Sequence, residues 1–327
     1  MGSVYLDCSG LEVRRDGEAL AVYVNGVRGT VIPFKLIDRL VLRGRQARLE
    51  TDVILALADR GAAIVIQAAR APQRIAHVLG PAHNDAAIRL AQGAAVRDAA
   101  YCHAFARSVV TAKLRRQGRL LRDLLDARPD PRKPLFAAAA AVRAAVEAAQ
   151  RTEVTSVLRG VEGAAARAYF QGYAAVLPPA AGFHGRNRRP PRDPVNVCLS
   201  LAYTLLHADA VRAAHAAGLD PLLGFYHRPA FGRESLASDL VEPLRSLADR
   251  WVWHQWREGI LRPAQFSQKD GICLMHKSGR EAFYPAWEAA AAPARRWLRL
   301  SCARLANGLR ASGLPLLEDP HEEEPGE

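Results

Sequence analysis

The sequence predicts an α+β protein, in which a small β-rich N-terminal domain, sandwich-like and with one helix, precedes a larger all-α domain. Two patterns and the length support this. Short runs rich in β-branched residues fill positions 1–80, whereas alanine-rich and arginine-rich segments with helical periodicity fill most of 81–312. The length of 327 residues also favours two domains, at roughly 150 residues each.

The N-terminal domain is predicted to consist of hairpins. Its strand-like runs are VYLDCS, LEVRRD, LAVYVN, TVIPF and IDRLVLRG, with turn pairs such as Asp16-Gly17 and Asn25-Gly26 between them. One helix is expected from an N-cap at Thr51 to Gly61. The run AIVIQ is then typical of a buried strand. No glycine-rich phosphate loop follows any strand, which argues against a dinucleotide-binding fold.

The second domain is predicted to be helical. Helical periodicity appears near 84–127, 133–150, 153–176, 194–217, 236–258 and 285–311. Asp193 as N-cap and Pro194 at the first helical position begin the fourth of these helices, and Gly218 ends it. We expect 271–284 to form a hairpin with Ser278-Gly279 in its turn. Residues 313–327 are predicted to be an acidic, disordered tail.

The charge is strongly basic and unevenly distributed. The net charge is +12, but the last ten residues carry −6, which leaves +18 for the rest of the chain. A folded body this basic suggests a polyanionic partner, most often nucleic acid. A charge that serves only solubility, or an arginine-rich genome, would produce the same number.

Cysteine spacing and hydropathy exclude other classes. None of the five cysteines forms a CxxC pair and their number is odd, so neither a disulfide framework nor a zinc knuckle is expected. The N-terminus lacks a basic segment followed by an apolar run, as a signal peptide would have. The longest apolar stretch, around 136–142, is too short to cross a bilayer. We therefore expect a cytoplasmic protein with no membrane partner.

Glu162 occupies an otherwise apolar face of the predicted helix 153–176. Leu158, Ala165 and Tyr169 lie on that face at helical spacing. A carboxylate in such surroundings is costly unless it pairs with a cation or binds a metal ion. A metal ligand and an ordinary Glu–Arg ion pair are both open at this point.

The segment 224–245 combines an imidazole with two carboxylates. His227 ends an apolar run, and Asp239 and Glu242 share one face near the start of the next helix. These groups suit an Mg²⁺ or Mn²⁺ site with open positions. Alternatively, the acids only satisfy the positive end of the helix and His227 is an ordinary loop residue. Pro243 predicts a kink or a late start of the helix.

A polar stripe follows the apolar helix predicted at 194–217. It consists of Asn196, Ser200, Tyr203 and His207. Facing inward, such a stripe needs polar partners and indicates a polar cavity or an active site. Facing outward, it is simply the solvated side of an amphipathic helix.

Two basic segments are candidates for phosphate contacts. A loop stiffened by a Pro-Pro pair contains Arg186, Arg188, Arg189 and Arg192. The helical segment 112–123 adds Lys113 and four arginines, some of which form an ordinary solvated face. Neither segment has enough aromatic residues to predict base stacking.

Read in order, these segments resemble the CRISPR spacer-acquisition integrase family. The resemblance begins at VYLDCSG, continues through LALADRGAAIVI and RLAQ, and runs to about residue 312. It is strongest at three motifs: RGVEGAAARAYF, RRPPRDPVNVCLSLAYTLL and LGFYHRPAFGRESLASDLVEPLR. Three motifs in this order behind a β-rich domain make the resemblance specific.

The resemblance implies that Glu162, His227 and Glu242 bind a divalent metal, Mg²⁺ or Mn²⁺. Many relatives have Asp at position 242, so Glu keeps the charge and adds one methylene of reach. Asp239 matches a further acidic position of the family. The expected catalytic residues are Glu162, His227, Asp239, Glu242, Asn196 and Tyr203, and the expected DNA contacts are Arg167, Arg186, Arg188, Arg189, Arg192 and Arg245.

The resemblance also implies an activity and partners. The helical, catalytic domain would insert foreign DNA fragments into a CRISPR array, by attack of a DNA 3′-hydroxyl on a phosphodiester at the repeat boundary. The β-rich domain would mediate homodimerisation, and a small ferredoxin-like partner would bridge two dimers in a prokaryotic cytoplasm. Two alternatives remain: a stand-alone metal-dependent DNA nuclease, and a non-catalytic basic DNA-binding protein.

Overall fold

The computed structural model describes residues 2–43, 46–68, 74–80, 83–127, 130, 132–187 and 190–317. The chain divides into two compact units, Met1–Asn84 and Asp85–Glu327. The first is rich in strands and the second is mostly helical, which confirms the predicted α+β class. The boundary lies close to the position predicted from the change in composition near residue 80.

The first unit contains two four-stranded sheets. In one, three parallel strands are followed by an antiparallel edge strand, in the order β1 (Gly2–Asp7), β5 (Ile37–Arg43), β7 (Ala63–Gln67) and β8 (Ile75–Val78). The other is an antiparallel meander with a short parallel edge, in the order β4 (Val27–Pro33), β3 (Ala19–Val24), β2 (Leu11–Asp16) and β6 (Arg48–Leu49).

One hydrophobic core joins both sheets and α1 (Thr51–Asp59), the one α-helix among the described residues of this unit. It contains fully buried side chains from each of these elements, including Leu11, Leu40 and Leu57. The predicted turn at Asn25-Gly26 is present, with positive φ at both residues, as a tight hairpin turn requires. The two sheets and one described α-helix match the sandwich-like arrangement expected from the strand-like runs.

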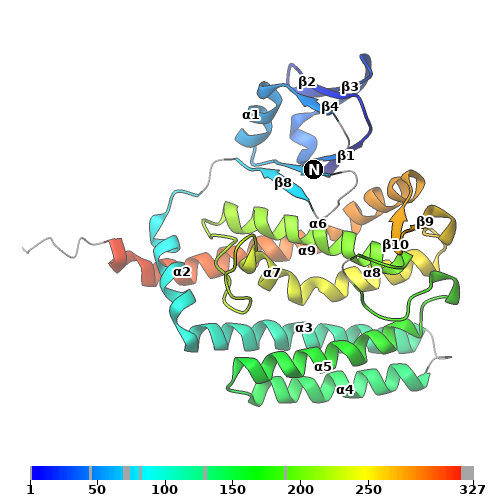
Figure 1. Ribbon diagram of the computed structural model, residues 1–327. Helices are drawn as coiled ribbons and strands as arrows, with labels where there is room; N and C mark the ends of the chain where they lie inside the picture. Colours follow the sequence, from blue (N-terminus) through cyan, green and yellow to red (C-terminus); the bar gives the residue numbers. More distant parts are fainter. Residues whose placement is uncertain are drawn as a thin grey trace, which may run out of the picture. The chain divides into compact units, whose positions relative to one another are not determined.

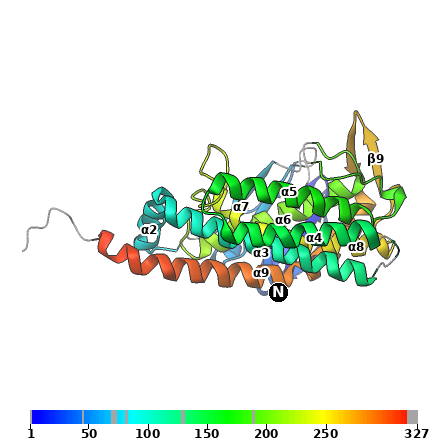
Figure 2. The ribbon, with the colours of Figure 1, turned by 90° about the horizontal axis from the view of Figure 1, so that it is seen from below.

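The second unit is built from eight α-helices among the described residues (Figure 1). They are α2 (Ala86–Arg97), α3 (Ala99–Ala127), α4 (Arg132–Arg151), α5 (Thr155–Ala174), α6 (Pro194–Ala216), α7 (Ser235–Val241), α8 (Arg245–Arg257) and α9 (Lys277–Gly313). Helices α3, α4 and α5 pack side by side, as Figures 1 and 2 both show. Helix α6 packs against α7, α8 and α9, and most of its residues are buried because its sequence is apolar on nearly every face.

Two predicted helices are interrupted. Asp98 separates α2 from α3, because its carboxylate accepts hydrogen bonds from the backbone N–H groups of Ala100 and Tyr101, at 2.8 and 3.0 Å, and so caps a new helix. The helix predicted at 236–258 is broken by the 3₁₀ turn η3 (Glu242–Leu244), which contains Pro243. This break confirms the kink that the proline predicted.

The hairpin predicted at 271–284 is displaced toward the N-terminus. Its strands are β9 (Phe266–Lys269) and β10 (Ile272–Met275), and the turn residues Asp270 and Gly271 both have positive φ. The predicted turn at Ser278-Gly279 is wrong, since these residues lie in the first turn of α9. An Asp-Gly pair satisfies the tight turn and leaves the following residues free to form a helix.

Helix α9 also extends further than predicted. It runs through two internal prolines to Gly313, and the 3₁₀ turn η5 (Leu314–Leu317) follows. The prediction of a disordered tail is therefore wrong for 313–317. The chain packs closely against α2 at this point, because a Cβ added to Gly313 would lie only 2.0 Å from the Ala87 carbonyl oxygen. The acidic positions 318–327 lie outside the described residues.

Two exclusions from the sequence can be compared with the structure. All five cysteines are free, and three of them, Cys198, Cys273 and Cys302, are buried, as expected of small apolar side chains. Within the described ranges, no helix combines the length and the hydropathy needed to span a bilayer.

Candidate active site

Two glutamates from distant parts of the sequence converge on one lysine in the helical unit. The Lys113 ammonium, on α3, donates to the Glu162 carboxylate on α5 and, at 2.6 Å, to Glu242 Oε2 at the start of η3. The three side chains are no more than 16% exposed. Glu162 is therefore paired inside the protein, but with a lysine rather than the expected arginine.

Electrostatics keep Glu242 ionised despite its burial. Burial alone would raise the pKa of this carboxyl, but the cations of Arg245 and Lys113 outweigh it and hold the pKa well below its usual range, with His227 adding to the effect. Arg245 Nε donates to Glu242 Oε1 at 2.8 Å. Burial would lower the pKa of Lys113, yet Glu242 and Glu162 together raise it. Glu242 and Lys113 therefore both carry their charges at neutral pH.

His227 is held in one orientation by a buried carboxylate. Its ring Nδ1 lies 2.6 Å from Asp239 Oδ1, and its backbone N–H donates to the same oxygen at 2.8 Å. Asp239 Oδ2 accepts from the backbone N–H groups of Phe225 and Tyr226, at 2.8 and 3.0 Å. With Nδ1–H donating to the carboxylate, the Nε2 lone pair remains available to a ligand.

A close contact between loop and helix positions this histidine. Gly224 packs against the start of α7, where an added Cβ would lie 2.5 Å from the Ser235 carbonyl carbon and 2.8 Å from the His227 oxygen. Only glycine fits this approach. Next along the loop, the Tyr226 hydroxyl donates to Glu162, and the Arg159 guanidinium donates to the Tyr226 carbonyl at 2.9 Å. The loop is therefore tied to α5 beside the glutamate.

A second buried cluster supports the first. Asp249 of α8 accepts hydrogen bonds from the hydroxyls of Tyr203 on α6 and, at 2.6 Å, Tyr169 on α5. The Tyr173 hydroxyl donates to the Asp249 backbone carbonyl at 2.7 Å. Burial raises the pKa of Asp249 to about 6, although the tyrosine hydrogen bonds and nearby arginines favour its charged form.

The aromatic ring of Tyr203 links the two clusters. The guanidinium of Arg245 lies 4.6 Å from its centroid and that of Arg186 lies 5.3 Å from it. Arg186 also donates to Asn196 Oδ1 at 2.5 Å and to Ser200 Oγ at 3.0 Å. The polar stripe of α6 thus faces inward, and the solvent-facing alternative is wrong for Asn196 and Tyr203, which are 0% and 8% exposed.

The chain matches a known family over most of its length. A family model described as CRISPR associated protein Cas1 matches residues 4–289. The chain belongs to the Cas1 family. It is 34% identical over 296 residues to a CRISPR-associated endonuclease Cas1 of Thermodesulfovibrio yellowstonii, covering 88% of this chain and 91% of that protein. It is also 33% identical to one from Rhodospirillum rubrum, covering 88% and 86%. The resemblance carried by the three motifs is confirmed.

Solved structures share the fold of this Cas1-family chain. A casposase bound to integration product has a TM-score of 0.82 at 21% identity, covering 95% of this chain and 91% of that one. A Cas1 protein from Thermotoga maritima has a TM-score of 0.81 at 19% identity, covering 99% and 100%. At these identities the likeness extends to the fold alone.

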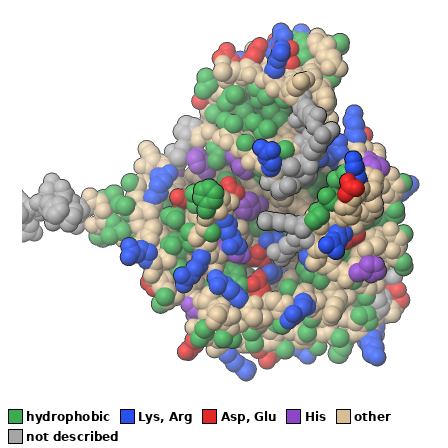
Figure 3. All heavy atoms as spheres, viewed as in Figure 1, with side chains coloured by type: hydrophobic (Ala, Val, Ile, Leu, Met, Phe, Trp, Pro, Cys, Tyr) green, Lys and Arg blue, Asp and Glu red, His purple; other side chains and the backbone are tan. Residues whose placement is uncertain are grey.

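The arginines expected to contact DNA fall into three groups in this Cas1-family chain. Arg167 and Arg192 are exposed, whereas Arg186 and Arg245 are partly buried in the clusters around Tyr203. Arg188 and Arg189 lie outside the described residues. Figure 3 shows Lys and Arg side chains on the helical unit around a recess in which acidic side chains are visible.

Sequence reasoning missed two central residues of the Cas1 site. The sequence places Lys113 in a basic segment that is a candidate for phosphate contacts, yet its side chain is only 8% exposed. Its spacing of four residues from Val109 and from Gln117, both largely buried, is the signal that places it on the inward face. Asp249 lies between Ala248 and Arg250 in a tryptophan-rich helix and carries no local signal, because its tyrosine partners come from other helices.

The donor set of this Cas1 site fits a divalent cation in its chemistry. Two carboxylates that already share one cation, with an imidazole nearby, offer the oxygen and nitrogen ligands that Mg²⁺ and Mn²⁺ accept. In the described part of the chain, no three His, Cys, Asp or Glu side chains converge directly as metal ligands. The Lys113 ammonium lies between the two glutamates, so a metal ion held by both must displace it.

Proposed function

We propose that this chain is a metal-dependent DNA endonuclease and integrase of CRISPR adaptation, which inserts DNA fragments by attack of a 3′-hydroxyl on a phosphodiester at a repeat boundary. The observation that carries the proposal is the convergence of Glu162 and Glu242 on one cation, beside a histidine oriented by Asp239. Curated relatives named as Cas1 endonucleases, and a casposase structure bound to integration product, support it.

Glu162, Glu242 and the Nε2 atom of His227 would hold Mg²⁺ or Mn²⁺. When bound, the ion neutralises the negative charge that develops on the phosphoryl oxygens. Asp239 is completely buried and accepts four hydrogen bonds from the His227 loop, so its role is to position the imidazole and fix its tautomer. It does not itself order the attacking hydroxyl.

Tyr203 and Asn196 likewise have positioning roles. Tyr203 holds Arg245 through its ring, and Arg245 in turn donates to Glu242. Asn196 accepts a hydrogen bond from Arg186, whose guanidinium also lies near the Tyr203 ring. Both side chains are buried and fully engaged, which leaves the 3′-hydroxyl, or a water molecule in hydrolysis, to be oriented at the Glu162 and His227 side of the site.

DNA, a second copy of the chain and a bridging protein are the proposed partners. The net charge of +12 suits a polyanion. A solved Cas6-RT-Cas1–Cas2 complex has a TM-score of 0.77 at 22% identity, covering 95% of this chain and 35% of that one, and its composition is the support for a bridging partner. On the β4 edge strand, Val27 and Val31 are 71% and 41% exposed, and an apolar edge of this kind suits dimerisation of the β-rich unit.

The decisive experiment compares strand transfer by DNA fragments with free and with blocked 3′-ends. With Mn²⁺, the wild type should join 3′-hydroxyl fragments to a plasmid carrying repeat DNA and should not join blocked ones. Glu162→Ala and His227→Ala should reduce joining by about 10²- to 10³-fold, as expected when a transition-state interaction is removed. Glu147→Ala and His254→Ala, at exposed positions of α4 and α8, are the matched controls.

Two results would contradict the proposal in different ways. If blocking the 3′-end leaves the products unchanged, the chain is a nuclease without integration activity. If the Glu162 and His227 variants join DNA as well as their controls do, the cluster is structural and the chain acts by binding DNA.

A further inference from the structure

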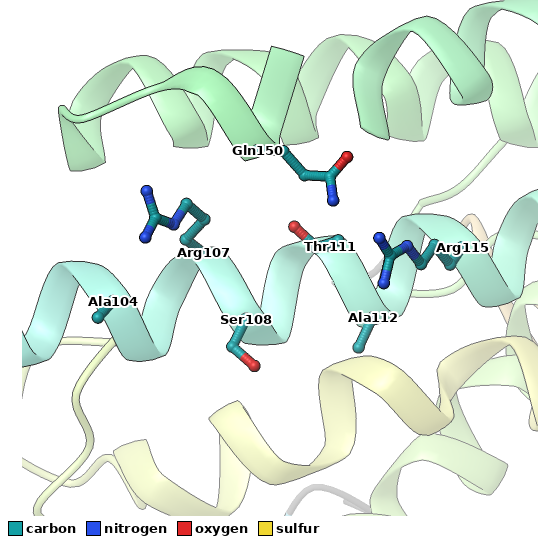
Figure 4. Close-up of a pocket in the computed structure, with 7 residues that line it drawn as sticks. All are labelled: Ala104, Arg107, Ser108, Thr111, Ala112, Arg115 and Gln150. Carbon is teal, nitrogen blue, oxygen red and sulfur yellow. The ribbon is translucent and has the colours of Figure 1, made fainter. Parts of the chain in front are cut away.

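A pocket lies along α3, next to the C-terminal end of α4 (Figure 4). It is lined by Ala104, Arg107, Ser108, Thr111, Ala112, Arg115 and Gln150. Thr111 and Lys113 are separated by about 200° around the helix, at 100° per residue. The pocket and the lysine of the active site are therefore on opposite faces of the same helix.

Every polar side chain of the pocket can donate a hydrogen bond, and no acidic side chain lines it. Arg107, Thr111 and Arg115 are spaced by four residues, so one helix face presents two guanidinium groups on either side of a hydroxyl. In Figure 4, Gln150 faces this row from the C-terminal end of α4.

Thr111 is the lining residue whose buried hydroxyl can still form a hydrogen bond with a ligand. Its side chain is only 7% exposed, and its hydroxyl oxygen is buried without a hydrogen-bond partner among the described residues. A buried hydroxyl without a partner costs on the order of 1–3 kcal/mol. A valine of nearly the same shape would remove that cost, so the hydroxyl suits a ligand that approaches between the two arginines.

We propose that this pocket binds a phosphate group of the DNA backbone, with the Arg107 and Arg115 guanidinium groups neutralising it and the Thr111 hydroxyl donating to it. Paired guanidinium donors match the geometry of phosphate oxygens. The inference rests on the proposed function, since it assigns a backbone contact to the DNA on which that function acts. It adds an anchoring point on the face of α3 opposite to the chemistry.

The first test uses a substitution that changes no charge. Thr111→Val should fold at least as stably as the wild type and bind a 30-base-pair duplex about 10- to 100-fold more weakly by fluorescence anisotropy, as expected for loss of a hydrogen bond to a charged group. A variant that is more stable but binds the duplex with unchanged affinity would overturn the proposal.

The second test measures the salt dependence of binding by a double variant. Arg107→Gln/Arg115→Gln should bind the duplex more weakly, and the slope of log Kd against log salt should fall by about one, as expected for one lost phosphate contact. Arg119→Gln/Arg122→Gln is the matched control, because it removes the same charge from exposed positions of α3 outside the pocket. Equal slopes and affinities for the two double variants would refute the proposal that the pocket binds a DNA phosphate.

Two readouts separate the remaining possibilities. If inorganic phosphate raises the melting temperature of the wild type but not of the pocket variants, while all bind the duplex equally, the ligand is free phosphate and the assignment to DNA is wrong. At saturating DNA, the pocket variants should still perform strand transfer, since the glutamate cluster is intact. If the pocket proposal is refuted, the proposed function therefore still holds. The proposed function is tested separately, by strand transfer with the Glu162 and His227 variants.

Discussion

At the scale of single residues, the site is defined by charges that balance one another inside the protein. Lys113 supplies one positive charge to two carboxylates that the chain brings together from positions 162 and 242. Removal of one member of such a buried group leaves the others uncompensated, which costs more free energy than the intact group ever contributed. The lysine is therefore a structural counter-ion as well as a neighbour of the proposed metal ligands.

Lys113→Met is expected to destabilise the metal-free protein by about 3 kcal/mol, because Glu162 then loses its cation while Glu242 keeps only Arg245. Urea denaturation in the presence of a chelator measures this. Mn²⁺ should raise the melting temperature of the variant more than that of the wild type, since no ammonium competes for the glutamates. Lys133→Met, at an exposed position of α4, is the control and should behave as the wild type. Equal stabilities of all three proteins would contradict the counter-ion role.

Asp249 predicts a pH-dependent stability. Its pKa is raised from 3.8 to about 6 in the folded protein, so the unfolded chain releases this proton first as the pH rises. The contribution of Asp249 to stability should therefore fall between pH ~4 and ~6 and stay constant above, by an amount on the order of 3 kcal/mol. Denaturation of the wild type and of Asp249→Asn across this range measures it, because other groups cancel in the difference. Parallel stability curves for the two proteins would show that burial does not raise the pKa of the Asp249 carboxyl.

At the scale of elements, close packing between helices holds the glutamate on α5. Gly172 lies where α5 meets α4, and an added Cβ would come within 2.5 Å of the Ala138 Cβ and 3.3 Å of Leu121 Cδ2 on α3. Gly163 lies in the same helix, but nothing lies within 4 Å of a Cβ added there. The two glycines therefore differ in whether tertiary packing requires them.

Gly172→Ala is expected to lower the free energy of unfolding by about 1–3 kcal/mol, because the added methyl group overpacks the interface with α4. Gly163→Ala should instead raise it by about 0.5–1 kcal/mol, since alanine loses less backbone entropy in a helix and finds open space. Thermal and urea denaturation of the two variants tests both signs. A stabilised Gly172→Ala would show that α5 can move away from α4 at no cost.

At the scale of the whole molecule, the net charge of +12 predicts how the protein meets DNA. A protein that contacts six to ten phosphates loses roughly 10³- to 10⁵-fold in affinity between 50 and 200 mM salt, because condensed counter-ions are released on binding. We expect the loss of duplex affinity of the wild type over this salt interval to lie in that range, measured by anisotropy at several salt concentrations. Binding that is insensitive to salt would contradict a backbone-dominated interface.

Much of the fold could be predicted from the sequence because its patterns are local. The β-branched strand runs, the Asn25-Gly26 turn, the cap at Asp193 with Pro194 after it, and the break at Pro243 depend only on neighbouring residues. The displaced hairpin shows the limit of this reasoning. Two Gly-containing pairs lay close together, and only the packing of Gly279 against Met275 and Gln265 shows which one lies in a helix.

The sequence by itself determined the fold class, the family motifs and the candidate residues Glu162, His227 and Glu242. Backbone propensity and motif spacing depend only on residues that are close together in the sequence. Only the tertiary structure decided that Lys113 joins the two glutamates, that Asp239 lies behind His227, and that three tyrosines gather around Asp249. Such contacts join side chains from different helices, and the energy of a buried charge depends on partners that no local pattern specifies.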